Sequence, residues 1–202
     1  MIDPKTIQTY DKSAKELAKF FKGIGSRVED VERGLKLADA TAGAHVVEIG
    51  CGDGRDAQEI HKRVDWYEGF DPSIELLKLA RSKVPGASFV LADALSYKYP
   101  DNLDVVFAFA SLLHVNKTDL VKVFEKVSKS LKPGGILYLS VRERPDYEVE
   151  NRNDEFGERV FYHYSPKVIK ELSSGFFDSV YEAHMTIGRG DWLVMALSNN
   201  KN

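Results

Sequence analysis

The chain has 202 residues, of which 43% are hydrophobic and 29% charged, and its formal net charge is -3. This composition is typical of a globular protein with a core, and no basic block favours nucleic-acid binding through bulk charge. No run of about 18 apolar residues could cross a bilayer, and the polar N-terminus lacks a signal-peptide pattern. The single cysteine, Cys51, cannot form an internal disulfide. We therefore expect a single-domain cytoplasmic protein.

Two helices are predicted before the first strand. Apolar side chains recur at spacings of three and four between residues 5 and 24, which indicates one amphipathic helix. A second helix is predicted over residues 26–40, with Ser26 as its N-cap and Glu29 three positions later. That spacing is typical of a capping box.

Strands and helices then alternate along the middle of the chain. Most of the strands are apolar on both faces, which is typical of a parallel sheet covered by helices on both sides. The pattern therefore predicts an α/β fold. The predicted strands span residues 46–50, 66–71, 87–93, 103–109 and 134–141, and the predicted helices span 54–64, 72–84 and 117–132.

The last third of the chain has a different pattern. Residues 142–164 are polar and aromatic without a clear period, and a connection this long is usually functional or mobile. A helix is predicted over residues 165–175, and strand-like segments 176–187 and 192–198 flank the short turn GRGD. A turn this short predicts a β-hairpin, so at least one of its strands runs antiparallel to the rest of the sheet.

The segment VVEIGCGDGRD, Val46–Asp56, places glycines at alternate positions directly after a predicted strand. Open parallel sheets bind ligands at the carboxyl ends of their strands, and glycines there let a ligand lie against bare backbone. In the dinucleotide fingerprint G-x-G-x-x-G, counted from Gly50, a glycine should occupy position 55, where this chain has Arg55. Glu48 also directs a negative charge at the turn, which disfavours phosphate and favours a cation.

Two further acids end the following strands. Asp71 follows the second strand, where a carboxylate can accept hydrogen bonds from both hydroxyls of a ribose. Asp93 follows the third strand, where it could meet an adenine amino group. Each of these acids alone is often structural. Together with Glu48, they predict a nucleoside ligand that is cationic rather than phosphorylated.

These motifs resemble those of class I S-adenosylmethionine-dependent methyltransferases. The resemblance covers residues 43–142 in order, through VVEIGCGDGRD, GFDPS, LADAL, LDVVFAFASLLHV and LKPGGILYLSV. It implies a doubly wound, mostly parallel seven-stranded sheet with an antiparallel C-terminal hairpin. It also implies one methyltransferase domain, residues 1–202. The implied parts are an N-terminal helical cap (1–42), a cofactor-binding core (43–142), a substrate-side loop (143–164) and the last helix with its hairpin (165–202).

The resemblance implies a site for S-adenosylmethionine and its product S-adenosylhomocysteine. The glycine turn would hold the methionine portion, with Glu48 and Asp53 near its ammonium group, while Asp71 would bind the ribose and Asp93 the adenine. Arg55 would pair with the cofactor carboxylate, and an ion pair within its own turn is the alternative. The implied cofactor-binding residues are Tyr10, Glu48, Gly50, Cys51, Gly52, Asp53, Arg55, Asp71, Pro72, Ser73, Asp93, Ala94, Leu95, Ala108 and Phe109.

On the acceptor side, His114 is the candidate general base, because the unperturbed pKa of histidine lies near neutrality; a structural role is the alternative. Tyr10, Arg142, Arg159 and Tyr162 are candidate substrate-binding residues, since arginine and tyrosine recognise anionic or aromatic molecules. A solvated loop is the alternative for the last three. We expect in-line attack of a small-molecule acceptor on the sulfonium methyl, with catalysis mainly from positioning.

Other functions stay open at this point. An RNA or protein methyltransferase, a non-catalytic S-adenosylmethionine-binding module and a nucleotide-dependent oxidoreductase are the alternatives. The histidines do not have metal-ligand spacing, so no metal site is expected. We expect no membrane partner, no nucleic acid, and a monomer or homodimer.

Overall fold

The computed structural model of the protein describes residues 2–40, 43–187 and 190–200. Its main sheet contains the strands β1 (His45–Ile49), β2 (Trp66–Asp71), β3 (Ser88–Leu91), β4 (Leu103–Phe109), β5 (Leu131–Arg142), β8 (Phe177–Ile187) and β9 (Gly190–Asn199). The helices are α1 (Pro4–Lys12), α2 (Ala14–Ile24), α3 (Val28–Leu37), α4 (Ala57–His61), α5 (Ile74–Lys83), α6 (Lys117–Ser130) and α7 (Pro166–Ser173), with a 3-10 turn, η1 (Leu112–His114).

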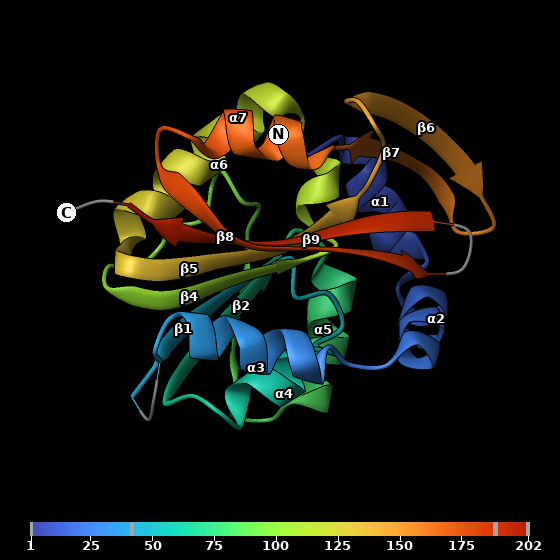
Figure 1. Cartoon of the computed structure of the whole chain (residues 1–202). Coiled ribbons are helices and arrows are strands. Elements are labelled where there is room, and N and C mark those ends of the chain that lie inside the picture. Colours follow the sequence, from blue (N-terminus) through green and yellow to red (C-terminus); the bar gives the residue numbers. More distant parts are fainter. Residues whose placement is uncertain (1, 41–42, 188–189, 201–202) are drawn as a thin grey trace.

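The seven strands lie in the order β3-β2-β1-β4-β5-β9-β8 (Figure 1). Strands β1 to β5 pair in parallel, whereas β9 is antiparallel to both of its neighbours, β5 and β8. The strand order reverses between β1 and β4, and ligands of open α/β sheets bind outside the carboxyl ends of strands at such a point. The predicted mostly parallel seven-stranded fold with a C-terminal hairpin is confirmed.

Two hydrophobic layers hold the helices on the sheet. On one face, α3, α4 and α5 pack against side chains such as Val46 and Phe107. On the other face, α6 and α7 pack against Val47 and Val106, which are the sequence neighbours of Val46 and Phe107. Figure 1 shows α3 and α4 on one side of the sheet and α6 and α7 on the other. Alternate residues of one strand thus serve both layers, as the continuous apolar runs predicted.

The N-terminal segment differs from its prediction in two places. The single helix expected over residues 5–24 is two helices, because the Ser13 backbone leaves helical geometry (φ -106°, ψ 21°) and its hydroxyl donates to the Phe156 carbonyl at 2.7 Å. The capping box was also wrong. Helix α3 follows Arg27 without a side-chain cap, and the Arg27 N–H donates to the Asp56 carboxylate at 2.9 Å.

Residues 142–164 are not the irregular connection that their composition suggested. Strands β6 (Glu148–Asp154) and β7 (Gly157–His163) form an antiparallel hairpin, a second sheet of their own. Helix α1 lies along β7: the Thr6 hydroxyl accepts from Val160 N–H at 3.0 Å, and the Thr9 hydroxyl donates to the Glu158 carbonyl at 2.7 Å. The cap and the hairpin are therefore joined to each other.

One further helix differs in length from its prediction, and two predicted segments include residues outside the described ranges. The helix expected over residues 54–64 is shorter, Ala57–His61, because the chain before it forms turns. Residues 41–42, where the predicted cap ends, and Gly188 and Arg189 of the predicted hairpin turn lie outside the described residues. None of the described helices is both long and apolar enough to span a membrane.

Close packing of α3 on the sheet generates a prediction. A Cβ atom added at Gly34 would lie 2.5 Å from the Phe107 ring, whereas one at Gly23 of α2 would meet nothing within 4 Å. We expect Gly34→Ala to destabilise the fold by about 1–3 kcal/mol through overpacking, and the control Gly23→Ala to be neutral or stabilising. Urea unfolding of both variants measures this. A Gly34→Ala protein as stable as Gly23→Ala would contradict the packing described here.

Candidate functional site

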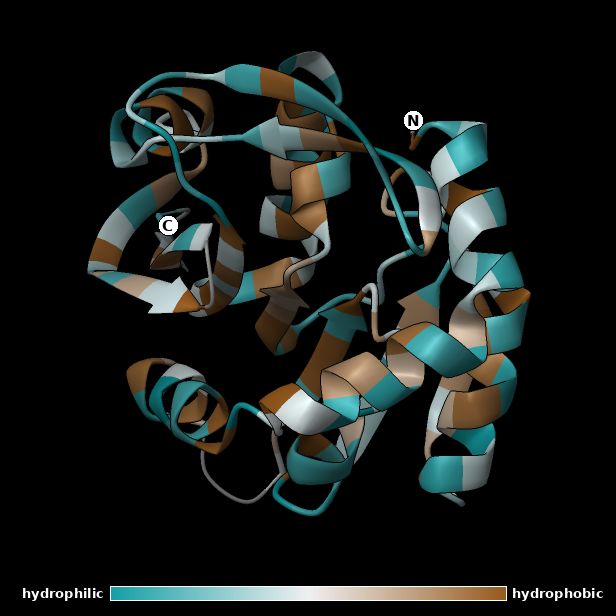
Figure 2. Cartoon of the chain, turned by 90° about the vertical axis from the view of Figure 1, so that its right-hand side faces the viewer, coloured by the Kyte–Doolittle hydropathy of each residue, from teal (hydrophilic) through white to brown (hydrophobic). Residues whose placement is uncertain are grey.

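A cavity of about 260 Å³ lies at the carboxyl ends of the parallel strands. Figure 2 looks along the sheet toward these strand ends, with the helices that follow the N-terminus standing beside them. The cavity walls come from α1, α2, the turns after β1, β2 and β4, the end of β5 and the β6–β7 hairpin. The lining residues include Tyr10, Arg27, Glu48, Gly50, Cys51, Gly52, Asp53, Arg55, Asp71, Pro72, Phe109, His114, Arg142, Arg152, Arg159, Phe161 and Trp192.

The three glycines after β1 have separate structural roles, and all have positive φ, at 69°, 54° and 76°. A Cβ at Gly50 would lie 2.4 Å from the Ser111 Cβ, and one at Gly54 would lie 3.1 Å from Ala80 of α5. These two glycines let η1 and α5 approach the turn. At Gly52, by contrast, a Cβ would meet nothing within 4 Å, so its bare backbone borders open space in the cavity.

Two buried carboxyl groups face the same cavity. Glu48 accepts a hydrogen bond from the Tyr67 hydroxyl at 2.6 Å, and burial together with nearby Asp56 raises its pKa to about 8. Asp71 accepts from the Gly52 and Ser73 N–H groups at 3.0 and 2.8 Å, and burial raises its pKa to about 6. Within the described residues neither acid forms an ion pair. A cation in the cavity would therefore favour their charged forms.

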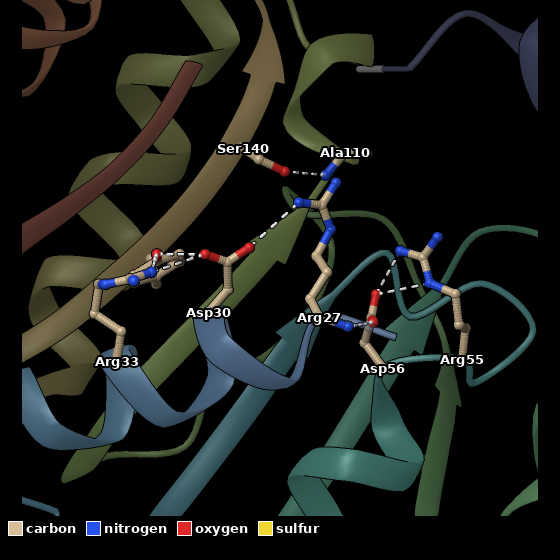
Figure 3. A network of polar contacts seen from close by, with 8 residues as sticks. Arg27, Asp30, Arg33, Arg55, Asp56, Ala110 and Ser140 are labelled. Atoms are coloured by element: carbon tan, nitrogen blue, oxygen red, sulfur yellow. Dashed lines mark hydrogen bonds and ion pairs between the residues drawn. The ribbon is translucent and has the colours of Figure 1, made fainter. Parts of the chain in front are cut away.

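The other charged residues of the glycine turn are already paired. Asp53 forms an ion pair with Lys83 of α5. The Arg55 guanidinium donates to Asp56 at 2.6 and 3.1 Å (Figure 3). Of the two alternatives for Arg55, this structure contains the ion pair within the turn, and its role toward a cofactor carboxylate stays a prediction.

Arg27 is a cavity residue that the sequence did not single out. Asp56 lies between Arg27 and Arg55, and the Nη1 atom of Arg27 is 3.4 Å from the Asp30 carboxylate (Figure 3). Its Nε is buried without a partner among the residues described. No local motif marks Arg27, because the fold alone brings the segment before α3 to the glycine turn.

His114 lies beneath the N-terminal cap. Its Nδ1 is 2.6 Å from the Val160 carbonyl, which can only accept, so Nδ1 carries the proton. Its Nε2 then accepts from the Tyr10 hydroxyl at 2.8 Å. Burial lowers the pKa of His114 to about 4. The imidazole is therefore neutral at pH 7 with both nitrogens bonded, an arrangement that orients Tyr10. The general-base role stays a prediction that this geometry does not favour.

The candidate substrate residues do not all reach the cavity. Arg142 and Arg159 line it, together with Arg152 and Trp192, which the sequence did not single out. Tyr162 is absent from the described lining and stacks on Tyr147, with ring centroids 6.1 Å apart. The reason is the strand period: Arg159 and Tyr162 are three residues apart on β7 and so point to opposite faces. Because the sequence analysis treated residues 142–164 as an irregular connection, it could not predict these opposite orientations.

Several residues expected to contact the cofactor also lie outside the described lining: Ser73, Asp93, Ala94, Leu95 and Ala108. Asp93 accepts from the N–H groups of Leu95 and Ser96 at 2.7 and 3.1 Å, so it caps its own turn. The Ser73 hydroxyl donates to Asp11 of α1 at 2.6 Å. The cofactor contacts of these five residues stay predictions.

The described residues contain no group of three or more His, Cys, Asp or Glu side chains placed to hold a metal ion.

Residues 46–135 match the family of methyltransferase domains. The trans-aconitate 2-methyltransferase of Rhizobium leguminosarum is 33% identical over 97 residues, which are 47% of this chain and 37% of that protein. The phosphoethanolamine N-methyltransferase of Plasmodium falciparum is 28% identical over 141 residues, 66% of this chain and 51% of that protein. The matches to these curated relatives thus span about half of their length or less.

Solved structures share the fold at lower identity. The 1,6-didemethyltoxoflavin-N1-methyltransferase of Burkholderia thailandensis, solved with 1,6-didemethyltoxoflavin and S-adenosylhomocysteine, has a TM-score of 0.74 at 16% identity, covering 96% of this chain and 88% of that chain. An S-adenosylmethionine-dependent methyltransferase from Mesorhizobium loti has a TM-score of 0.67 at 19% identity, covering 79% and 92%. Residues 46–135 thus match methyltransferase domains, and the chain shares its fold with S-adenosylmethionine-dependent methyltransferases.

The raised pKa of Glu48 predicts how stability changes with pH. Above pH 4.5 the unfolded chain has released this proton while the folded protein keeps it, so the Glu48 contribution to stability falls as pH rises toward about 8. We expect Glu48→Gln, which cannot ionise, to unfold at a higher temperature than wild type at pH 8, by about 2–4 °C for each 1 kcal/mol retained.

Thermal unfolding of the ligand-free protein between pH 5 and pH 8 measures this difference. The control Glu16→Gln removes an exposed carboxyl of α2 and should follow the wild-type profile. Parallel profiles for wild type and Glu48→Gln would contradict the burial argument.

Proposed function

We propose that the protein transfers a methyl group from S-adenosylmethionine to a small-molecule acceptor. The observation that carries this proposal is the bare Gly52 backbone beside two buried carboxyl groups, Glu48 and Asp71, that form no ion pair among the described residues. The match of residues 46–135 to methyltransferase domains supports it, as do the trans-aconitate, phosphoethanolamine and toxoflavin-type methyltransferases among similar proteins.

The residues of the cavity fit this cofactor. The turn at Gly52 would take the methionine portion, Glu48 would attract its ammonium group, and Asp71 would accept from the ribose hydroxyls through lone pairs that its two backbone donors leave free. Asp93 and its turn would meet the adenine, and Phe109 would lie near the reacting methyl. When bound, the cofactor supplies an electrophilic methyl group on a positively charged sulfur.

The contribution of the chain itself is positioning and exclusion of water. The predicted cap, residues 1–42, and the segment 143–164 would together cover the acceptor. The Tyr10 hydroxyl, held by His114, would fix the acceptor's orientation, and such alignment can supply about 7–11 kcal/mol of barrier reduction. Cytoplasmic location and a monomeric or homodimeric state stay predictions from the sequence.

Cofactor binding is tested with Asp71→Asn, which removes the charge in the cavity, and Glu68→Gln, a control on the same strand whose carboxylate contacts Tyr97 and Ser88 instead. A ligand at 100 times its Kd stabilises a protein by about 2.7 kcal/mol, a rise of roughly 5–11 °C for this size. We expect this rise with S-adenosylhomocysteine for wild type and Glu68→Gln, and a much smaller one for Asp71→Asn.

Equal rises in unfolding temperature in all three proteins would show that Asp71 does not bind the cofactor. The absence of a rise in wild type would contradict the proposed cofactor. A shift with NADH instead would indicate a dinucleotide enzyme. Formation of S-adenosylhomocysteine from S-adenosylmethionine with a panel of small molecules then separates an enzyme from a binding module.

The Tyr10–His114 hydrogen bond predicts coupled effects on turnover. With the acceptor that the panel finds, we expect His114→Ala and Tyr10→Phe each to lower kcat by less than the roughly 100-fold that a general base contributes. The double variant should lose little more than either single variant, because the two residues act through one contact. Cofactor affinity should be unchanged in His114→Ala. If His114→Ala lowers kcat only over one limb of the pH profile, His114 is the general base after all.

A further inference from the structure

Arg142 ends β5 at the far side of the cavity from the glycine turn. It pairs in register with Trp192 of β9, and its guanidinium lies 4.8 Å from the centroid of a Trp192 ring. A Cβ added at Gly190 would fall 1.3 Å from the Arg142 Nη1. The guanidinium therefore occupies the space that a side chain at position 190 would take, fixed between backbone and indole at the cavity wall.

Among the described residues, the Arg142 side chain forms no hydrogen bond or ion pair, and its Nε is buried and unsatisfied. Burial and the nearby cation Arg152 lower the pKa of Arg142, and the nearby anions Glu150 and Asp191 offset only part of this effect. A half-buried charge without a counterion is costly unless something else compensates it.

The other arginines of this wall are paired. Arg152 donates to Glu150 at 2.8 and 3.0 Å, and Arg159 pairs with Asp154. Arg159 is only 7% exposed, yet its Nε is also buried without a partner among the described residues. Each of these two arginines thus has one carboxylate partner, whereas Arg142 forms no ion pair within the described residues.

The acidic and basic side chains that form no ion pair among the described residues thus come from different walls of the cavity. The turns after β1 and β2 contribute the ion-pair-free acids Glu48 and Asp71, whereas the end of β5 and the hairpin contribute the unpaired Arg142 beside Arg152 and Arg159. The acidic end fits a cationic cofactor. The basic end fits a molecule of the opposite charge.

We infer that the acceptor carries an oxyanion group, a carboxylate or a phosphate, and that Arg142 binds this group. The inference rests on the proposed function and adds the class of acceptor. A planar guanidinium binds such groups through two parallel hydrogen bonds, and a guanidinium already held on Gly190 and Trp192 loses little freedom on binding. Arg142 is then the residue that selects acids over their neutral analogues.

The test uses protein saturated with S-adenosylhomocysteine and matched probes: trans-aconitate, benzoate and phenyl phosphate against the neutral benzamide, at constant ionic strength. Titration calorimetry gives each Kd. We expect at least one acid to bind more tightly than benzamide, and Arg142→Gln to weaken that acid by about 10-fold or more. Arg142→Lys, which keeps the charge without the planar fork, should lose part of the affinity. Benzoate against phenyl phosphate decides between carboxylate and phosphate.

The control is Arg144→Gln, which removes the same charge two residues along the chain. Arg144 donates to the Glu143 carbonyl, is 3.9 Å from Glu148 and does not belong to the described cavity lining; acid affinity should be unchanged. If no acid binds more tightly than benzamide, or if Arg142→Gln binds acids as wild type does, the inference is wrong. Titration with S-adenosylhomocysteine alone tests the proposed function separately. If wild type does not bind S-adenosylhomocysteine, both the proposed function and the inference about the acceptor are wrong.

Discussion

The carboxylate of Asp71 holds together the two turns on which the site is built. It accepts the N–H of Gly52 after β1 and the N–H of Ser73 after β2, so one buried group fixes both strand ends. The contact depends on Gly52, whose φ of 54° is one that residues with a Cβ atom rarely adopt. Two backbone donors offset part of the cost of burying a carboxylate.

From Asp71, a series of hydrogen bonds leads to the cover of the cavity. Ser73 donates through its hydroxyl to Asp11 of α1, and the preceding residue, Tyr10, donates to His114. His114 in turn donates to the Val160 carbonyl of β7. Helix α1 and the β6–β7 hairpin are thus placed relative to the glycine turn by side-chain hydrogen bonds rather than by the main sheet. This arrangement also brings two arginines of the hairpin, Arg152 and Arg159, to the cavity beside Arg142.

Local patterns in the sequence predicted the sheet and the glycine turn well, because apolar strands, caps and glycine positions are properties of short segments. Contacts between distant segments were missed. The break at Ser13 depends on the Phe156 carbonyl, 143 residues away. The β6–β7 hairpin was not predicted because β6 is largely exposed and lacks an apolar face. Without its strand period, the opposite orientations of Arg159 and Tyr162 could not be known. Arg27 lies at the cavity next to Asp56, which accepts its backbone N–H from 29 residues away in the sequence.

The attachment of α1 is unequal on its two sides. Toward β7 it is held by the hydroxyls of Thr6, Thr9 and, at its end, Ser13, and by the Lys5–Glu158 ion pair. Toward α5 it is held by the single carboxylate of Asp11, which accepts from Ser73 and from the Glu75 N–H. Lifting α1 from α5 therefore breaks fewer bonds than separating it from the hairpin.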